Sequence, residues 1–275
     1  MRLTTTVLIF FLPCFLCSSA GAEMLPVRKV RAGIPPYSVA ENMVRHNDAA
    51  VARAVADLGQ EKMAPTPHLV WLADCDARLQ PSLFYPEPEA RIYSVRNLAN
   101  QLALSLGAVD YGITELLAPV LLITGNTDSD SLRLLGRGKQ LAPELRGELD
   151  RLPLTAKQAG QAGVGKDAPA VEANVDYQVA EAVKRYQGRI ASGRLVVIGA
   201  VFDLDNQYGL GANRLLIINI NGETEAERLR AMSHLTRLDK RLLDLVGRRA
   251  PRQEAAEMPT DAEPTLTPLP SKKKK

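Results

Sequence analysis

The stretch APVLLITGNTDSDS, residues 118–131, joins a mostly apolar run to a crowded polar turn. The run APVLLIT is typical of a buried strand, because strands covered on both faces are apolar almost without interruption. The turn GNTDSDS, residues 125–131, follows directly at the carboxyl end of that strand. In open α/β sheets, ligands bind beyond the carboxyl ends of the strands. This stretch therefore predicts an α/β fold and places a candidate site at the turn.

Two earlier segments repeat the pattern of an apolar strand that ends in polar residues. HLVWLA, residues 68–73, runs into DCDAR, and RIYSV, residues 91–95, runs into RNLAN. The remaining pattern predicts helices over residues 38–59 (capped by Ser38), 101–117, 171–190 and from about Ser131, and strands over 194–203 and 214–221. We therefore predict a mostly parallel β-sheet flanked by helices, with the three polar turns converging on one crevice.

The first 22 residues have the features of a secretory signal peptide. Arg2 precedes the apolar segment VLIFFLPCFLC, and the small residues AGA at 20–22 suit cleavage near Ala22. We expect a periplasmic or secreted protein with no membrane span in the mature chain. Cys17 leaves a lipoprotein as the alternative to soluble export, although Leu16 before it is larger than a lipid-modified cysteine favours.

The rest of the chain divides by composition. Residues 23–37 are Pro-rich and irregular, residues 38–248 form the predicted domain, and residues 249–275 form a predicted disordered tail. Within the domain, residues 150–170 are predicted to be a loop insertion. The segment 223–249 has apolar residues at helical spacing and predicts a long amphipathic C-terminal helix.

The composition suits one sizeable domain and excludes a nucleic-acid-binding surface. The chain has 275 residues, of which 46% are hydrophobic, and a formal net charge of +3. Its Lys and Arg residues are scattered among acidic residues, apart from the Lys272–Lys275 run. Cleavage near Ala22 would leave Cys75 as the single cysteine, which excludes an internal disulfide and a thiolate-rich zinc site.

Taken in order, the three turns resemble those of the β-class carbonic anhydrases, whose pattern is Cys-x-Asp-x-Arg, Arg-Asn-x-x-Asn and Gly-His-x-x-Cys-Gly. VRNLAN at 95–100 matches the second turn. The segments before the third turn (105–128) and after it (174–179 and 195–209) are similar to the family's helices and strands. The resemblance covers residues 38–222. It implies an α/β domain, a homodimer in which an N-terminal helical arm packs on the partner, and a zinc site that hydrates carbon dioxide.

The family's zinc ligands do not carry over to this sequence. Its first cysteine falls on Asp74, its histidine on Asn126 and its second cysteine on Ser129. Cys75 stands one place late, and the alternation of a strand would turn it away from the crevice as a small buried residue, with a reactive thiol as the alternative. Zinc prefers thiolate and imidazole ligands. We therefore predict that zinc is absent and that the protein has no cofactor.

The remaining crevice residues each have a chemical and a structural interpretation. Asp76 and Arg78 match the family's catalytic dyad, but without a metal they suit an ion pair that shapes the turn. Arg96 and Asn97 are expected to fix the backbone of the crevice. The oxygen-rich set suits either a hard-cation site or helix caps, with Ser131 or Asp130 as the cap of the next helix. That set comprises Asp74, Asp76, Asn126, Asp128, Ser129 and Asp130.

Three functions follow from these residues. The first is a catalytically degenerate relative of the β-carbonic anhydrases that binds a small, unidentified ligand in the former active-site crevice. The second is an active carbonic anhydrase with a non-standard metal site. The third is a structural or interaction protein whose C-terminal region docks a partner.

Overall fold

The computed structural model describes residues 35–57, 67–136, 141–154, 166–233, 235 and 237–249. The predicted signal peptide lies outside these residues, and so does the predicted tail apart from residue 249.

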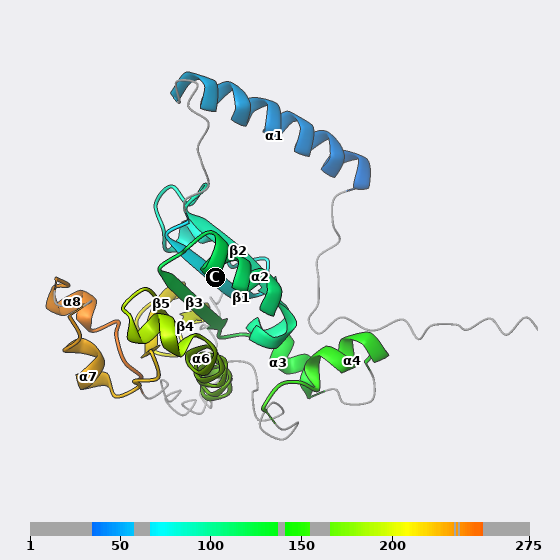
Figure 1. Ribbon diagram of the computed structural model, residues 1–275. Helices are drawn as coiled ribbons and strands as arrows, with labels where there is room; N and C mark the ends of the chain where they lie inside the picture. The colour runs from blue at the N-terminus through cyan, green and yellow to red at the C-terminus, as the bar shows by residue number, and fades with distance from the viewer. Residues whose placement is uncertain are drawn as a thin grey trace, which may run out of the picture.

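A five-stranded sheet forms the centre of the domain (Figure 1). Its strand order is β2-β1-β3-β4-β5, in which β2, β1, β3 and β4 run parallel and β5 runs antiparallel to β4. The strands are β1 (Leu69–Asp74), β2 (Ile92–Asn97), β3 (Val120–Asn126), β4 (Val196–Asp203) and β5 (Arg214–Ile220). This arrangement confirms the prediction of a mostly parallel α/β sheet, and each predicted strand is present within a few residues of its expected bounds.

The helices follow the predicted order, with more breaks than the sequence suggested. They are α1 (Pro36–Asp57), α2 (Leu106–Asp110), α3 (Asp130–Leu135), α4 (Pro143–Leu149), α6 (Ala168–Ala191), α7 (Ala226–Arg230) and α8 (Lys240–Leu243). Short 3₁₀ turns occur at η1 (Pro81–Leu83), η2 (Leu98–Asn100) and η3 (Leu102–Leu104), and η4 (Tyr111–Glu115) is a π-helical turn. The predicted helix over 101–117 is therefore η3, α2 and η4 in succession.

The two faces of the sheet pack against different segments. On one face, Val70 and Leu72 of β1 belong to the large core that includes Val175 and Val179 of α6. On the other face, the alternate residue Trp71 packs with Phe202 of β4 and with the loop after β1. Both sets of side chains are buried, which explains why the strands are apolar without alternation.

Two glycines set the distance between α6 and the sheet. A Cβ atom on Gly125 of β3 would lie 2.6 Å from Val171 Cγ1, and one on Gly199 of β4 would lie 2.8 Å from Val179 Cγ2. Neither separation is possible for a real side chain. Gly125 therefore lets α6 approach the strand at the point where the polar turn begins.

The prediction of one long C-terminal helix is wrong. The described part of this segment contains only α7 and α8 (Figure 1), with i→i+3 hydrogen bonds from Leu235 N to Met232 O (2.9 Å) and from Leu238 N to Leu235 O (3.0 Å) between them. Asp239 ends the connection by capping α8 through Leu242 N at 2.9 Å. The break brings Leu229, Leu235 and Val246 together over Ile220, because a straight helix cannot wrap around the end of β5.

Two smaller expectations are corrected at helix starts, and one further helix was not predicted. Helix α1 begins at Pro36, so Ser38 lies inside it and is not its cap. Helix α4 was not anticipated before the expected insertion over 150–170, and α6 already begins at Ala168 within that range.

Among the described residues, no helix combines the length and apolar character needed to cross a membrane.

Candidate functional site

The three polar turns meet at one edge of the sheet, as the sequence predicted. Asp74 at the end of β1 pairs in register with Asn97 at the end of β2, and β3 runs parallel beside β1 until Asn126. A pocket of about 340 Å³ opens beyond these ends. Its lining residues are Asp74–Arg78 from the first turn, Leu98 from the second, and Asp130, Ser131 and Leu134 from the third turn and α3.

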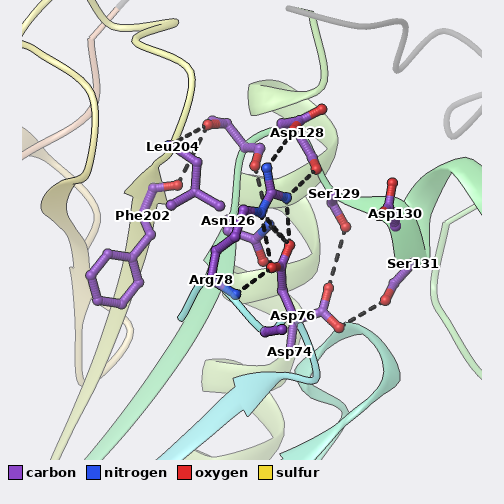
Figure 2. A network of polar contacts seen from close by, with 12 residues as sticks. Asp74, Asp76, Arg78, Asn126, Asp128, Ser129, Asp130, Ser131, Phe202 and Leu204 are labelled. Atoms are coloured by element: carbon purple, nitrogen blue, oxygen red, sulfur yellow. Dashed lines mark hydrogen bonds and ion pairs between the residues drawn. The ribbon is translucent and has the colours of Figure 1, made fainter. Parts of the chain in front are cut away.

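Asp74 lines the pocket and connects the three turns through hydrogen bonds, of which Figure 2 shows those from Ser129 and Ser131. Its side chain is 3% exposed, and its Oδ1 accepts hydrogen bonds from Cys75 N (2.8 Å), Ala99 N (3.0 Å) and Ser131 Oγ (2.7 Å). Its Oδ2 accepts a fourth from Ser129 Oγ at 3.3 Å. Burial raises the pKa of Asp74 above its ordinary value, although the hydrogen bonds from Ser131, Ala99 and Cys75 oppose that shift.

Asp76 and Arg78 form an ion pair that reaches across to the third turn. Arg78 Nε donates to both Asp76 carboxylate oxygens, at 2.9 and 3.1 Å. The same guanidinium contacts Asp128 Oδ2 at 2.5 Å and Asp128 O at 3.0 Å (Figure 2). Hydrogen bonding to Asp76, then to Asp128, raises the pKa of Arg78 further above its ordinary value. Both charged groups of this pair are therefore engaged by the protein itself.

Asp128 is held in an unusual conformation at the centre of the third turn. Its φ of 56° lies in the left-handed region, which aspartate adopts only occasionally. Buried Asp167, just before α6, accepts from Asp128 N (3.1 Å) and Ser129 N (2.7 Å). Arg133 of α3 pairs with the Asp128 carboxylate at 2.9 Å. These contacts fix the turn from three directions.

Asn126 and Ser129 point into the same region and are almost fully buried. Asn126 Nδ2 donates to Thr127 O (3.1 Å) and makes a longer contact with Asp76 Oδ2 (3.4 Å), whereas Asn126 Oδ1 has no hydrogen-bond partner among the described residues. Ser129 Oγ accepts from Leu132 N at 3.3 Å and is the cap of α3. The cap is therefore Ser129 instead of the expected Ser131 or Asp130, because Ser131 donates to Asp74.

Arg96 and Asn97 make structural contacts at the second turn. The guanidinium of Arg96 donates to Leu79 O and lies over the Trp71 ring, 5.0 Å from its centroid. Asn97 Nδ2 donates to Gln101 O and Ser105 Oγ, both at 2.8 Å. Both residues thus hold backbone or neighbouring side chains in place around the turn.

Cys75 differs from the expectation of a buried side chain that faces away from the crevice. It is exposed and lines the pocket. Strand alternation does not apply to it, because β1 ends one residue earlier, at Asp74. Partial burial of the thiol and the neighbouring Asp74 raise the pKa of Cys75 to about 11. The thiol is therefore protonated at neutral pH, which is unlike an activated cysteine.

The carboxylates of the site are engaged in protein contacts. Asp130 pairs with Arg133 at 2.7 Å, while Asp76 and Asp128 pair with Arg78. Within the described ranges, no three or more His, Cys, Asp and Glu side chains are grouped so that they could hold a metal ion.

Sequence reasoning missed two parts of this site. Asp167 lies outside the polar turns, within the predicted loop insertion, and its only local signal is Pro169 two residues later, a residue type that is common in the first turn of a helix. Asn174 of α6 donates to Ala99 O at 2.9 Å and approaches the Asn100 side chain at 3.3 Å. Such contacts join positions about 75 residues apart, so no local spacing of residues in the sequence predicts them.

Comparisons with known proteins agree with this geometry. A profile of the carbonic anhydrase family matches residues 69–209. Three β-carbonic anhydrase structures superpose on the chain. CcaA is 15% identical, with a TM-score of 0.54 over 66% of this chain and 94% of its own, and a tetrameric enzyme of Sordaria macrospora is 15% identical, with a TM-score of 0.54 over 66% of this chain and 98% of its own. CafA of Aspergillus fumigatus is 16% identical, with a TM-score of 0.52 over 72% of this chain and 96% of its own. A search of curated protein sequences found no significant match. Because the profile spans half of the chain and the sheet carries the same fold, this protein belongs to the β-class carbonic anhydrase family.

Proposed function

We propose that this protein is a catalytically degenerate β-carbonic anhydrase that holds no zinc and does not hydrate carbon dioxide. The observation that carries the proposal is the engagement of Asp74, Asn126 and Ser129, which stand where the family pattern has cysteine, histidine and cysteine. Asp74 receives four hydrogen bonds from the protein, and Ser129 caps α3. Asn126 turns its amide nitrogen toward Asp76.

This donor set does not fit a zinc ion. Catalytic zinc takes three protein ligands drawn from thiolate, imidazole and carboxylate, and it uses them to generate hydroxide from bound water near pH 7. Here the three positions offer one carboxylate, one amide oxygen and one hydroxyl. Extracting the Asp74 oxygens for a metal would leave the buried Ala99 amide without its acceptor.

The charge around the pocket also opposes the family reaction, whose product is the bicarbonate anion. The carboxylates of Asp74, Asp76, Asp128 and Asp130 outnumber the guanidinium groups of Arg78 and Arg133. Arg78 already faces two carboxylates, so it has little remaining attraction for an anion. A small ligand of this pocket would accordingly be neutral or cationic.

The test is a metal analysis of the purified mature protein, followed by a stopped-flow carbon dioxide hydration assay with zinc present. We expect zinc far below one ion per chain and no hydration above the buffer rate. The triple variant Asp74→Cys/Asn126→His/Ser129→Cys should bind zinc, whereas the single variant Asn126→His, which adds one imidazole to the Asp74 carboxylate and so stays below three ligands, should not. Stoichiometric zinc with rapid hydration in the unmodified protein would establish the alternative, an active enzyme that the family match favours.

We also propose that the protein is exported after cleavage near Ala22, which the composition of residues 1–22 supports. N-terminal sequencing and intact mass of the protein isolated from its own cells test this. A chain that begins near Glu23 supports soluble export, a lipid-modified chain that begins at Cys17 identifies a lipoprotein, and an uncleaved chain contradicts both.

A further inference from the structure

A small polar cavity shares Asp74 with the pocket and is lined by the residues that stand in the family's zinc-ligand positions. Its volume is about 10 Å³, which is room for one water molecule. Its polar lining comes from Asp74, Asn100, Asn126, Ser129 and Asn174. The cavity is therefore too small for an organic ligand, and only a single water molecule or a bare ion could occupy it.

Two of these side chains have a buried polar atom that finds no partner in the part of the chain that the structure describes. Asn126 is 1% exposed and Asn100 is 2% exposed. Asn126 Oδ1 is an acceptor without a donor, and Asn100 Nδ2 is a donor without an acceptor. Buried groups of this kind are rare in folded proteins, and an ordered water is the common partner.

Rotating the two amides does not remove these unpartnered atoms. If Asn126 were flipped, its oxygen would face the Asp76 carboxylate and Thr127 O, which are both acceptors. If Asn100 were flipped, its nitrogen would face Asn174 Nδ2, a donor that now lies 3.3 Å from Asn100 Oδ1. The neighbours therefore fix one acceptor and one donor at the cavity.

The pairing of an acceptor with a donor selects the occupant. A cation would meet the amide hydrogens of Asn100, and an anion would meet Asn126 Oδ1 and the Asp74 carboxylate. Water satisfies both sides, because it accepts from Asn100 Nδ2 while it donates to Asn126 Oδ1 and to a carboxylate oxygen.

We propose that one ordered water molecule occupies this cavity and bridges Asn100 of the second turn to Asn126 at the end of β3. The proposal rests on the metal-free function above. It assigns a neutral, hydrogen-bonding occupant to the place that a metal ion takes in the family's active members.

A crystal structure at about 1.5 Å resolution or better, from crystals soaked in zinc chloride and measured at the zinc absorption edge, tests the proposal. We expect one peak at about 2.7–3.2 Å from Asn126 Oδ1 and Asn100 Nδ2, without anomalous signal. An empty cavity would overturn the bridging water and leave the proposed function standing. An anomalous peak at about 2.0–2.2 Å from the side chains would overturn both.

Oxygen-17 relaxation dispersion of the solvent, which detects internal water with long residence times, gives a second measurement. The variant Asn126→Leu removes the acceptor, and it should lose the contribution of one water molecule. Thr124→Val removes a buried hydroxyl from the same strand, where it accepts from Trp71 Nε1, and serves as the matched control. An equal dispersion amplitude in the wild type and in Asn126→Leu contradicts the proposal. If that variant does not fold, the crystal measurement on the unmodified chain decides.

Discussion

At the scale of single residues, the site is a set of polar groups that satisfy one another. Asp74 is the centre of this set, because its carboxylate receives donors from the first, second and third turns. Its position beside β1 was predicted, whereas its hydrogen-bond partners were not. A buried carboxylate of this kind links the stability of the fold to pH.

The stability of the protein should fall with rising pH because of Asp74. Burial raises the pKa of Asp74 in the folded state above the unfolded value near 4, so its contribution is fully present below about pH 4 and is lost as pH rises through the folded pKa. Asp74→Asn retains an oxygen for the Oδ1 donors and removes the charge. The difference in free energy of unfolding, variant minus wild type, should therefore increase between pH 4 and 8.

Urea titrations at several pH values measure that difference. Asp110, whose pKa is lowered by Arg185, is the matched control: its contribution to stability is fully present above about pH 4 and is lost as pH falls through its folded pKa, so the difference for Asp110→Asn should stay constant between pH 5 and 8. A difference for Asp74→Asn that stays constant over the range would contradict the assignment.

The thiol of Cys75 should react slowly despite its exposure. A pKa of about 11 leaves little thiolate at neutral pH, so alkylation by iodoacetamide at pH 7.5 should be at least about tenfold slower than that of a cysteine in an unfolded peptide. Asp74→Asn should accelerate the reaction, because Asp74 contributes to the raised pKa. A rate equal to that of the peptide, measured by mass spectrometry, would rule this out.

At the scale of elements, the sequence predicted strands better than helices and turn residues better than their partners. The apolar runs at 68–73 and 118–124 identified β1 and β3, because strands that are buried on both faces tolerate few polar residues. The segment 223–249 was wrongly predicted as one long helix. Its apolar spacing is equally compatible with two short helices that fold over Ile220. Asp167 escaped notice because its role depends on where α6 begins relative to Asp128.

The close contact between β3 and α6 gives a prediction at this scale. Gly125→Ala would place a Cβ atom 2.6 Å from Val171 Cγ1, and overpacking of this kind costs about 1–3 kcal/mol of stability. Gly188→Ala within α6 is the matched control, since a Cβ there meets nothing within 4 Å, and it should stabilise the helix by about 0.5–1 kcal/mol. Thermal unfolding of both variants measures the effects.

Val171→Ala should relieve the overpacking of Gly125→Ala, because it removes the methyl group that the new Cβ would meet. The two substitutions should therefore couple favourably in a double-mutant cycle. Strictly additive effects would show that the destabilisation has another source.

At the scale of the whole molecule, α1 stands apart from the sheet in Figure 1. This helix exposes several large apolar side chains. Tyr37, Met43 and Val44 are about 70% exposed, at 73%, 68% and 72%. An exposed apolar set of this kind marks a surface that another protein covers. We propose that a second copy of this chain covers α1, in a homodimer with its helical arm packed on the partner.

Light scattering coupled to size-exclusion chromatography tests the homodimer. The variant Met43→Glu/Val44→Glu places two charges on the apolar surface of α1, and burying them would cost far more than the interface gains, so the dimer should dissociate toward monomer.

The control Asn42→Glu/Asn47→Glu adds the same charge to the same helix at positions that are already polar, and it should leave the mass unchanged. Because no α1 side chain whose burial the structure describes belongs to the core, both variants should unfold at nearly the wild-type temperature at which the sheet melts. A wild-type chain that elutes with monomer mass at all concentrations would contradict the proposal. If the Met43→Glu/Val44→Glu variant remains dimeric, the interface lies on another surface, because two unpaired charges cannot remain buried at α1.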